Sequence, residues 1–158
     1  MSPFFVTLKL VHIVSATVLF GTGLGTAFQM WAADRTCDAR VIAAVAANVV
    51  RADLYFTTPA IIVQPLTGFW LIHSEGFDPL TSWLVAAYAL YAIAGTCWLP
   101  VVWIQIRLRN LASDALARSA ALSADYHRLM RIWFALGWPA FLAVLVVFWL
   151  MVTKPIIW

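Results

Sequence analysis

The sequence predicts an all-α integral membrane protein: a four-helix up-down bundle with both chain termini on the outer, periplasmic side. Of its 158 residues, 64% are hydrophobic and 11% are charged, whereas a soluble domain has about 45–50% apolar and about 25% charged residues. The mean hydropathy is +0.90. Four apolar stretches reach the ~20 residues that a helix needs to cross a bilayer. This composition excludes a soluble globular enzyme and a disordered chain.

The four predicted spans cover approximately residues 4–31, 54–72, 83–106 and 132–153, within one transmembrane domain over residues 1–158. None of them shows the alternating pattern of a membrane barrel strand. Tryptophans mark the ends of the spans, as expected for amphipathic rings at the headgroup level. They are Trp31, Trp70, Trp83, Trp133 and Trp158.

Each span has its own local signals. The first is too long for the roughly 7–15-residue apolar region of a cleaved signal peptide. The second contains Pro59 and Pro65, which we expect to kink the helix and free carbonyls for nearby Thr and Gln side chains. Helical patterns over residues 40–50 and 108–117 extend the second and third helices beyond the bilayer. Ser123 is the expected N-cap of the fourth helix.

Arginine placement predicts the orientation. The connections between spans one and two and between spans three and four hold all eight arginines, and the opposite side has only Lys9 and Lys154. The positive-inside rule therefore places the Arg-rich connections in the cytoplasm. The arginines form no run, so we expect no nucleic-acid partner. Asp53, at the mouth of the second span, is expected to pair with one of the basic residues that open the fourth helix: His127, Arg128 or Arg131.

His12 is the main candidate for chemistry, because an ionisable group inside a span is by default a functional candidate. Lys9 and His12 lie three residues apart and share the small, polar face of the first helix. His12 either hydrogen-bonds a neighbouring helix or is an axial ligand to haem iron. Lys9, one turn nearer the surface, either pairs with a haem propionate or extends to the headgroups.

Three further residues complete the predicted cofactor site. Gly68 lies at the level of His12 and leaves room for a macrocycle or for another helix. His73 is a candidate second ligand or an exposed turn residue, and Met151 is a candidate ligand or a core filler. Gly21 and Gly25 form a GxxxG pattern that permits close helix contact. The predicted site is thus Lys9, His12, Gly68, His73 and Met151, with His12 as the metal ligand.

Other chemistries lack their residues. The sequence has no Ser-His-Asp arrangement, HExxH motif or carboxylate pair inside a span, which excludes hydrolysis and proteolysis. No Asp or Glu lies within a predicted span, which disfavours a proton-coupled transporter. Cys37 is in a polar connection and Cys97 is inside an apolar segment, so no disulfide is expected.

Several segments together resemble a bacterial family of predicted integral membrane proteins of unassigned function, and the resemblance covers nearly the whole chain. It implies the bacterial inner membrane as the location. The segments are Lys9-Leu-Val-His12, Asp53-Leu-Tyr-Phe-Thr-Thr-Pro59, Gln64-Pro-Leu-Thr-Gly68, Trp98-Leu-Pro100, Trp103-Ile-Gln105-Ile-Arg107, Tyr126-His127-Arg128, Trp133-Phe-Ala-Leu-Gly137 and Phe148-Trp-Leu-Met-Val-Thr-Lys154-Pro155.

A more distant similarity is to HemJ-type protoporphyrinogen oxidases, which are four-helix membrane proteins that bind haem b. The shared features are KxxH (Lys9 and His12), a proline and then a glycine in the second helix, and a closing Lys154-Pro155. The resemblance implies that His12 matches the haem-associated histidine. The family's Arg after the first-helix glycine and its Lys in the third helix are missing here, which argues against the same oxidase reaction.

Two hypotheses follow. The first is a small b-type haem protein of redox or electron-transfer type, with His12 as axial ligand and a membrane redox partner. The alternative is a cofactor-free membrane accessory or assembly subunit, or a pore for a small neutral molecule, in which the exposed GxxxG supports a homo-oligomer. In both, the lipid bilayer is the immediate partner. The sequence does not decide whether the protein is an enzyme.

Overall fold

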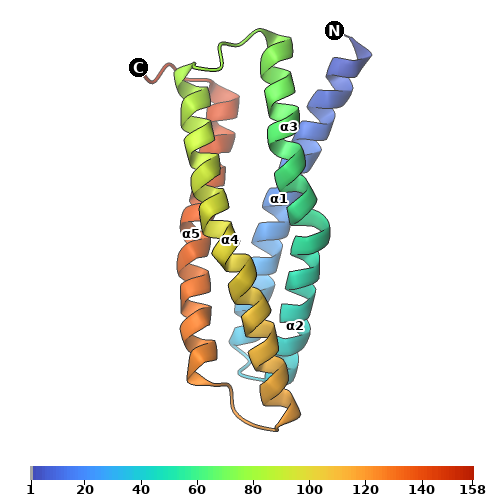
Figure 1. Cartoon of the computed structure of the whole chain (residues 1–158), viewed down its shortest axis with the longest axis vertical. Helices are drawn as coiled ribbons and strands as arrows, with labels where there is room; N and C mark the ends of the chain where they lie inside the picture. The colour runs from blue at the N-terminus through green and yellow to red at the C-terminus, as the bar shows by residue number, and fades with distance from the viewer. Residues whose placement is uncertain (1) are drawn as a thin grey trace.

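The computed structural model describes residues 2–158 as four long helical rods side by side (Figure 1). Helix α1 covers Pro3–Asp34. Helix α2 (Ala39–Ala52) continues through a π-helical turn, η1 (Asp53–Thr57), into α3 (Thr58–Glu75). Helices α4 (Ser82–Ala117) and α5 (Ala124–Thr153) complete the bundle. All four rods are long and apolar enough to cross a membrane, which confirms the predicted all-α four-helix bundle.

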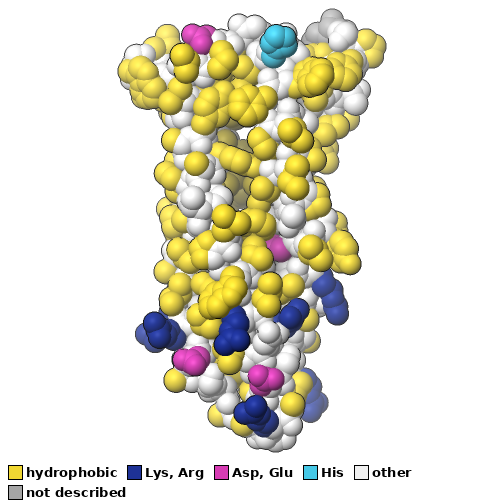
Figure 2. All heavy atoms as spheres, viewed as in Figure 1, with side chains coloured by type: hydrophobic (Ala, Val, Ile, Leu, Met, Phe, Trp, Pro, Cys, Tyr) yellow, Lys and Arg dark blue, Asp and Glu magenta, His cyan; other side chains and the backbone are white. Residues whose placement is uncertain are grey.

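Successive rods run in opposite directions, so both termini lie at one end (Figure 1). We call this the terminal end. Lys and Arg side chains gather toward the other end in Figure 2, which we call the Arg-rich end. It contains the α1–α2 and α4–α5 connections.

Capping residues define where the helices begin and end. The Ser123 hydroxyl accepts a hydrogen bond from the backbone N–H of Tyr126 at 3.2 Å, which confirms Ser123 as the N-cap of α5. Gly76 ends α3 with φ of +71°, a left-handed conformation that glycine adopts without a Cβ penalty. The predicted helical extensions are also confirmed, because α2 begins at Ala39 and α4 continues to Ala117.

Packing is concentrated at the two ends of the bundle. The larger core, at the Arg-rich end, joins α1, α2, α4 and α5. Its members are Met30, Ala33, Ile42, Ala46, Val49, Ile104, Leu108, Ala112, Tyr126, Met130 and Trp133. A smaller core at the terminal end consists of Trp83, Leu84, Ala87 and Leu150. Between them, α1 packs mainly on α3 and α4 mainly on α5, and the surface between α3 and α4 is hollowed (Figure 2).

The carbonyl that Pro65 frees in α3 has a different partner from the one predicted from the sequence. Pro65 has no N–H, so it leaves the carbonyl of Ile61 without its helical donor. The Tyr91 hydroxyl of α4 donates to that carbonyl at 2.6 Å. The prediction that Thr and Gln would satisfy the freed carbonyls was therefore wrong at this position. A tyrosine from another helix does so because its long side chain spans the hollow between α3 and α4.

The Arg-rich end contains a buried tyrosine that links the start of α5 to the end of α1. Tyr126 is 0% exposed, and its hydroxyl donates to the Asp34 carboxylate at 2.9 Å. Burial, together with this carboxylate, raises the pKa of Tyr126 above its ordinary value. The folded protein therefore favours the neutral phenol, and the contact stabilises the fold only while Tyr126 is protonated.

We predict that Tyr126→Phe lowers the free energy of unfolding by about 1.5–3 kcal/mol, the range for a hydrogen bond to a charged group. The wild type should also lose stability as pH rises past about 10, where the unfolded tyrosine ionises. The variant should lack the part of this loss due to Tyr126. Thermal unfolding in detergent at several pH values measures both effects. Tyr55→Phe is the control, because Tyr55 is 69% exposed; an equal effect in both variants would contradict the prediction.

Candidate functional site

His12 lies where α1 contacts α3. Its Nδ1 is 2.7 Å from the Thr67 hydroxyl oxygen. That hydroxyl has one hydrogen, which it donates to the Val63 carbonyl at 2.7 Å, so it accepts from His12. Nδ1 therefore carries the proton in the neutral ring, and Nε2 carries the lone pair. No side chain within residues 2–158 hydrogen-bonds Nε2.

The contact between α1 and α3 depends on small residues. A Cβ at Gly68 would lie 3.4 Å from Cε1 of the His12 ring, so glycine allows the imidazole to approach the α3 backbone. One turn along α1, the buried Ser15 hydroxyl donates to the Ala60 carbonyl at 3.1 Å. His12 and Ser15 thus face into the bundle, as the small, polar face of the first helix predicted.

Lys9 belongs to an ion cluster at the terminal end. Its Nζ lies 3.3 Å from one carboxylate oxygen of Glu75, and the Nζ of Lys154 lies 3.7 Å from the other. Lys154 also sits over the Phe77 ring, 4.4 Å from its centroid. The cluster joins α1, α3 and the end of α5. All three side chains are partly exposed, so each pair contributes little to stability, but the cluster has one excess positive charge.

The structure describes no hydrogen bond between His12 and the two remaining predicted site residues, His73 and Met151. His73 is exposed near the end of α3, and Met151 is 38% exposed on α5. In the described part of the chain, neither side chain makes a hydrogen bond or an ion pair. A Cβ at Gly21 or Gly25 would meet no side chain or neighbouring helix within 4 Å, so among residues 2–158 the GxxxG pattern mediates no close helix contact.

Asp53 forms a buried network that sequence reasoning missed. It is 6% exposed, accepts from Gln105 Nε2 at 2.5 Å and from the Thr57 hydroxyl at 2.7 Å. Gln105 in turn accepts from the Trp133 indole at 3.4 Å. The expected pairing of Asp53 with His127, Arg128 or Arg131 was wrong, because η1 turns the carboxylate toward α4. The one feature of the sequence that could have indicated this network is Gln105, a polar residue inside the apolar third span.

Two further polar atoms are buried in the middle of the bundle. Gln64 Oε1 on α3 and Trp98 Nε1 on α4 are buried and have no hydrogen-bond partner among the described residues. One is an acceptor and the other a donor, and such groups are costly to leave unpaired in a membrane interior. Each marks a place where water or a polar guest would be stabilised.

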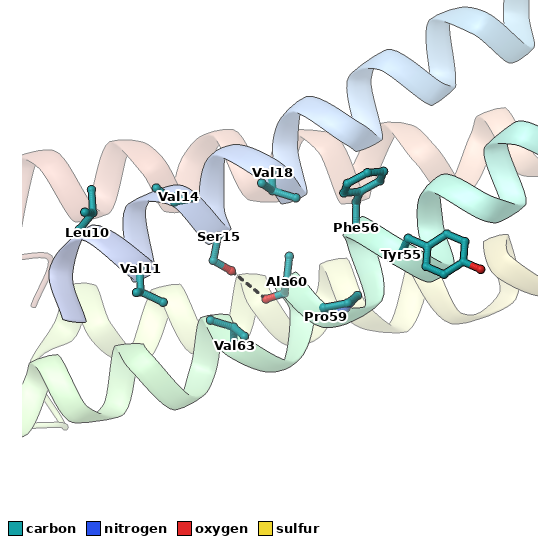
Figure 3. A pocket seen from close by; sticks show the side chains of 10 residues that line it. All are labelled: Leu10, Val11, Val14, Ser15, Val18, Tyr55, Phe56, Pro59, Ala60 and Val63. Atoms are coloured by element: carbon teal, nitrogen blue, oxygen red, sulfur yellow. Dashed lines mark hydrogen bonds between the residues drawn. The ribbon is translucent and has the colours of Figure 1, made fainter. Parts of the chain in front are cut away.

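An apolar groove of about 380 Å³ lies between α1 and the η1–α3 segment (Figure 3). The polar side chain that faces into the groove is Ser15, and its hydroxyl already donates a hydrogen bond to the Ala60 carbonyl. The Tyr55 hydroxyl points away from the groove (Figure 3), and His12 is not among the lining residues. The groove therefore has no free polar side chain that could bind a polar substrate.

Comparison with protein families gives one result that covers almost the whole chain. Residues 6–155 match the family described as "Predicted integral membrane protein (DUF2269)". The chain belongs to this family. No curated protein and no solved structure matches it. Membership of DUF2269 confirms the predicted membrane family, and the family description states a membrane location without an activity.

We predict that Gly68→Leu separates α1 from α3, because the His12 ring occupies the space that the leucine needs. The measurement is disulfide cross-linking of a Ser15→Cys, Ala60→Cys pair in a chain whose Cys37 and Cys97 are replaced by serine. Cross-linking should fall several-fold. Gly21→Leu is the matched control on open surface and should leave it unchanged. Equal cross-linking in the two variants would contradict this account of Gly68.

Proposed function

We propose that this DUF2269 protein is a small b-type haem membrane protein with a redox or electron-transfer role, in which His12 Nε2 is an axial ligand. The hydrogen bond from His12 Nδ1 to Thr67 supports this most directly. It orients a neutral imidazole and leaves Nε2 with its lone pair. Histidines that ligate metals commonly donate their other ring N–H in this way.

Two features near His12 support this proposal. Gly68 keeps the α3 backbone clear of a side chain beside the imidazole. Lys9 lies one helical turn from His12, toward the terminal end. It shares the single carboxylate of Glu75 with Lys154, so one positive charge remains for the haem propionates. Bound haem would supply a redox-active iron, and the chain supplies the ligand, the apolar surroundings and this charge. Lys9 and His12 are also the residues of the HemJ-like KxxH resemblance.

We further propose that the Arg-rich end faces the cytoplasm of a bacterial inner membrane and that both termini face the periplasm. Arg35 and Arg118 lie in the two connections at the Arg-rich end, and the other six arginines lie on the parts of α2, α4 and α5 that adjoin these connections. The terminal end carries the Lys9–Glu75–Lys154 cluster instead. Cationic residues are retained on the cytoplasmic side during insertion.

The second candidate is a cofactor-free pore for a small neutral molecule, or an accessory subunit. The buried, unpaired Gln64 Oε1 and Trp98 Nε1 favour a polar guest inside the bundle. The open surface around Gly21 and Gly25 suits a second copy or a membrane partner. Colour distinguishes the two candidates, because only the haem protein absorbs visible light.

We predict a Soret band, with sharp α and β bands after dithionite reduction, in detergent-purified protein from cells supplied with a haem precursor. His12→Ala should abolish these bands because it removes the ligand. Thr67→Val should weaken haem retention without abolishing it, since the imidazole loses its orienting acceptor. Absorbance spectra at matched protein concentration measure each effect.

His73→Ala and Met151→Leu show whether either residue is the second ligand. A shifted spectrum in one variant would identify that residue, and unchanged spectra would exclude both. All variants should elute as monodisperse species, so that loss of colour is separated from misfolding. A colourless wild type would overturn the haem proposal and leave the cofactor-free candidate.

For orientation, we predict that Cys37 reacts with a membrane-impermeant maleimide only after the inner membrane is opened. Cys37 is exposed in the α1–α2 connection. A cysteine introduced at exposed Ser74 of α3, in a chain with Cys37 and Cys97 replaced by serine, should react in intact spheroplasts. The reverse pattern would overturn the proposed topology.

A further inference from the structure

A recess of about 330 Å³ lies at the Arg-rich end, between the last turn of α1 and the first turns of α5. Its volume is near the lower limit of ligand pockets, which are about 300–1,000 Å³. Charged side chains of both signs line it together with apolar ones. They are Asp34, His127, Met130, Arg131 and Phe134. The recess therefore places an anion, a cation and an apolar surface side by side.

The opposite charges in this recess do not pair with each other. One carboxylate oxygen of Asp34 accepts from the Tyr126 hydroxyl at 2.9 Å, and the other accepts from no group among residues 2–158. Within the same residues, Arg131 uses only its Nε, which donates to the His127 carbonyl at 3.4 Å. The ion pairs of the described chain are those of Glu75, at the terminal end. Asp34 and Arg131 thus each keep a charge for a ligand.

The recess lies where the apolar spans end. Asp34 is three residues beyond Trp31, which is 42% exposed and packs its ring against Arg35, 5.1 Å from the centroid. Arg131 directly precedes the apolar part of α5, which begins at residue 132. Exposed tryptophans and arginines at the ends of spans are typical of the membrane–water interface. The recess is therefore at the depth of the lipid headgroups.

The junction of α1 and α5 continues from the recess into the apolar region. Gly23 lies three helical turns before Asp34, and Gly137 lies two turns after Met130, so each glycine is on the helix face that borders the recess. A Cβ at either glycine would meet no side chain or neighbouring helix within 4 Å. The junction therefore has open space below the recess, in the hydrocarbon region.

An aromatic contact ends this open stretch. The rings of Phe20 on α1 and Phe141 on α5 stack with their centroids 5.2 Å apart. From Asp34 to Phe20 the length along α1 is about 21 Å, at about 1.5 Å per residue. One leaflet of hydrocarbon is half of about 30 Å thick. The junction between the recess and the aromatic contact is thus long enough for an acyl chain.

We infer that the recess binds the headgroup of a phosphatidylethanolamine lipid and that the α1–α5 junction holds one of its acyl chains. The free oxygen of Asp34 accepts an N–H of the lipid ammonium. The Arg131 guanidinium and the His127 ring donate to the phosphate. A zwitterion complements a recess that has both charges unpaired, and the open junction favours a lipid over a soluble molecule. This binding is non-covalent and independent of haem.

Native mass spectrometry of the full purified chain, titrated with three lipids that have identical acyl chains, tests the inference. One phosphatidylethanolamine should bind per chain. It should bind about ten-fold more tightly than phosphatidylglycerol, which has no ammonium, or phosphatidylcholine, whose ammonium has no N–H. Glycerophosphoethanolamine, the headgroup without acyl chains, should not displace the lipid at equal concentration. Equally tight binding of either other lipid, or displacement by the soluble headgroup, would overturn the inference.

Two substitutions separate the contributions of the two charges. Asp34→Asn keeps an acceptor for Tyr126 but removes the negative charge, so the preference for phosphatidylethanolamine over phosphatidylglycerol should disappear. Arg131→Gln should weaken both lipids alike, because both contain the phosphate. The matched controls are Asp114→Asn and Arg118→Gln, at exposed positions of the same end outside the recess. A preference that survives Asp34→Asn, or an equal effect of the controls, would contradict the assigned contacts.

Gly137→Leu tests the acyl-chain contact and leaves the charged residues in place. The leucine side chain fills the open space of the junction, so the affinity for phosphatidylethanolamine should fall several-fold. Gly21→Leu is the matched control, because Gly21 is on a different face of α1 from Gly23 and Asp34. Unchanged affinity in Gly137→Leu would overturn the acyl-chain contact. If a charge variant does not fold, the comparison of the three lipids on the wild type decides the headgroup contact.

Discussion

The absence of water from the hydrocarbon core governs this structure, because each polar group there needs a partner inside the chain. The helices satisfy nearly all backbone groups, and the prolines create the exceptions. The carbonyl of Ile61, freed by Pro65, is reached by the Tyr91 hydroxyl across the bundle. Ser15 and Thr67 likewise use their hydroxyls on α3 carbonyls. These few polar contacts decide which helix faces meet.

Packing and polarity are distributed unevenly along the bundle. The large core at the Arg-rich end holds α1, α2, α4 and α5 together, whereas toward the terminal end the helices separate into two pairs. The surface between α3 and α4 is hollowed (Figure 2), and Gln64 of α3 and Trp98 of α4 each bury a polar atom that has no hydrogen-bond partner among the described residues. A well-packed Arg-rich end and a less packed middle are compatible with a bound ligand, because the α1–α3 and α4–α5 pairs can adjust around it.

His12 and Asp53 follow one design principle. Each is an ionisable group held by a neutral hydrogen-bonding side chain, with no opposite charge in contact. The Lys9–Glu75–Lys154 cluster is the contrasting case, since there the charges are paired and partly exposed. Its contribution is local charge at the terminal end.

The sequence alone determined the fold class, the helical extensions, the Ser123 cap and the inward face that carries His12. These depend on local properties: apolar length, helical spacing and capping chemistry. Only the tertiary structure decided that Thr67 accepts from His12, that Tyr91 reaches Ile61 and that Asp53 turns to Gln105. Those partners lie 55, 30 and 52 residues apart. Their meeting depends on the rotation and register of whole helices, and no local pattern encodes how one helix face is set against another.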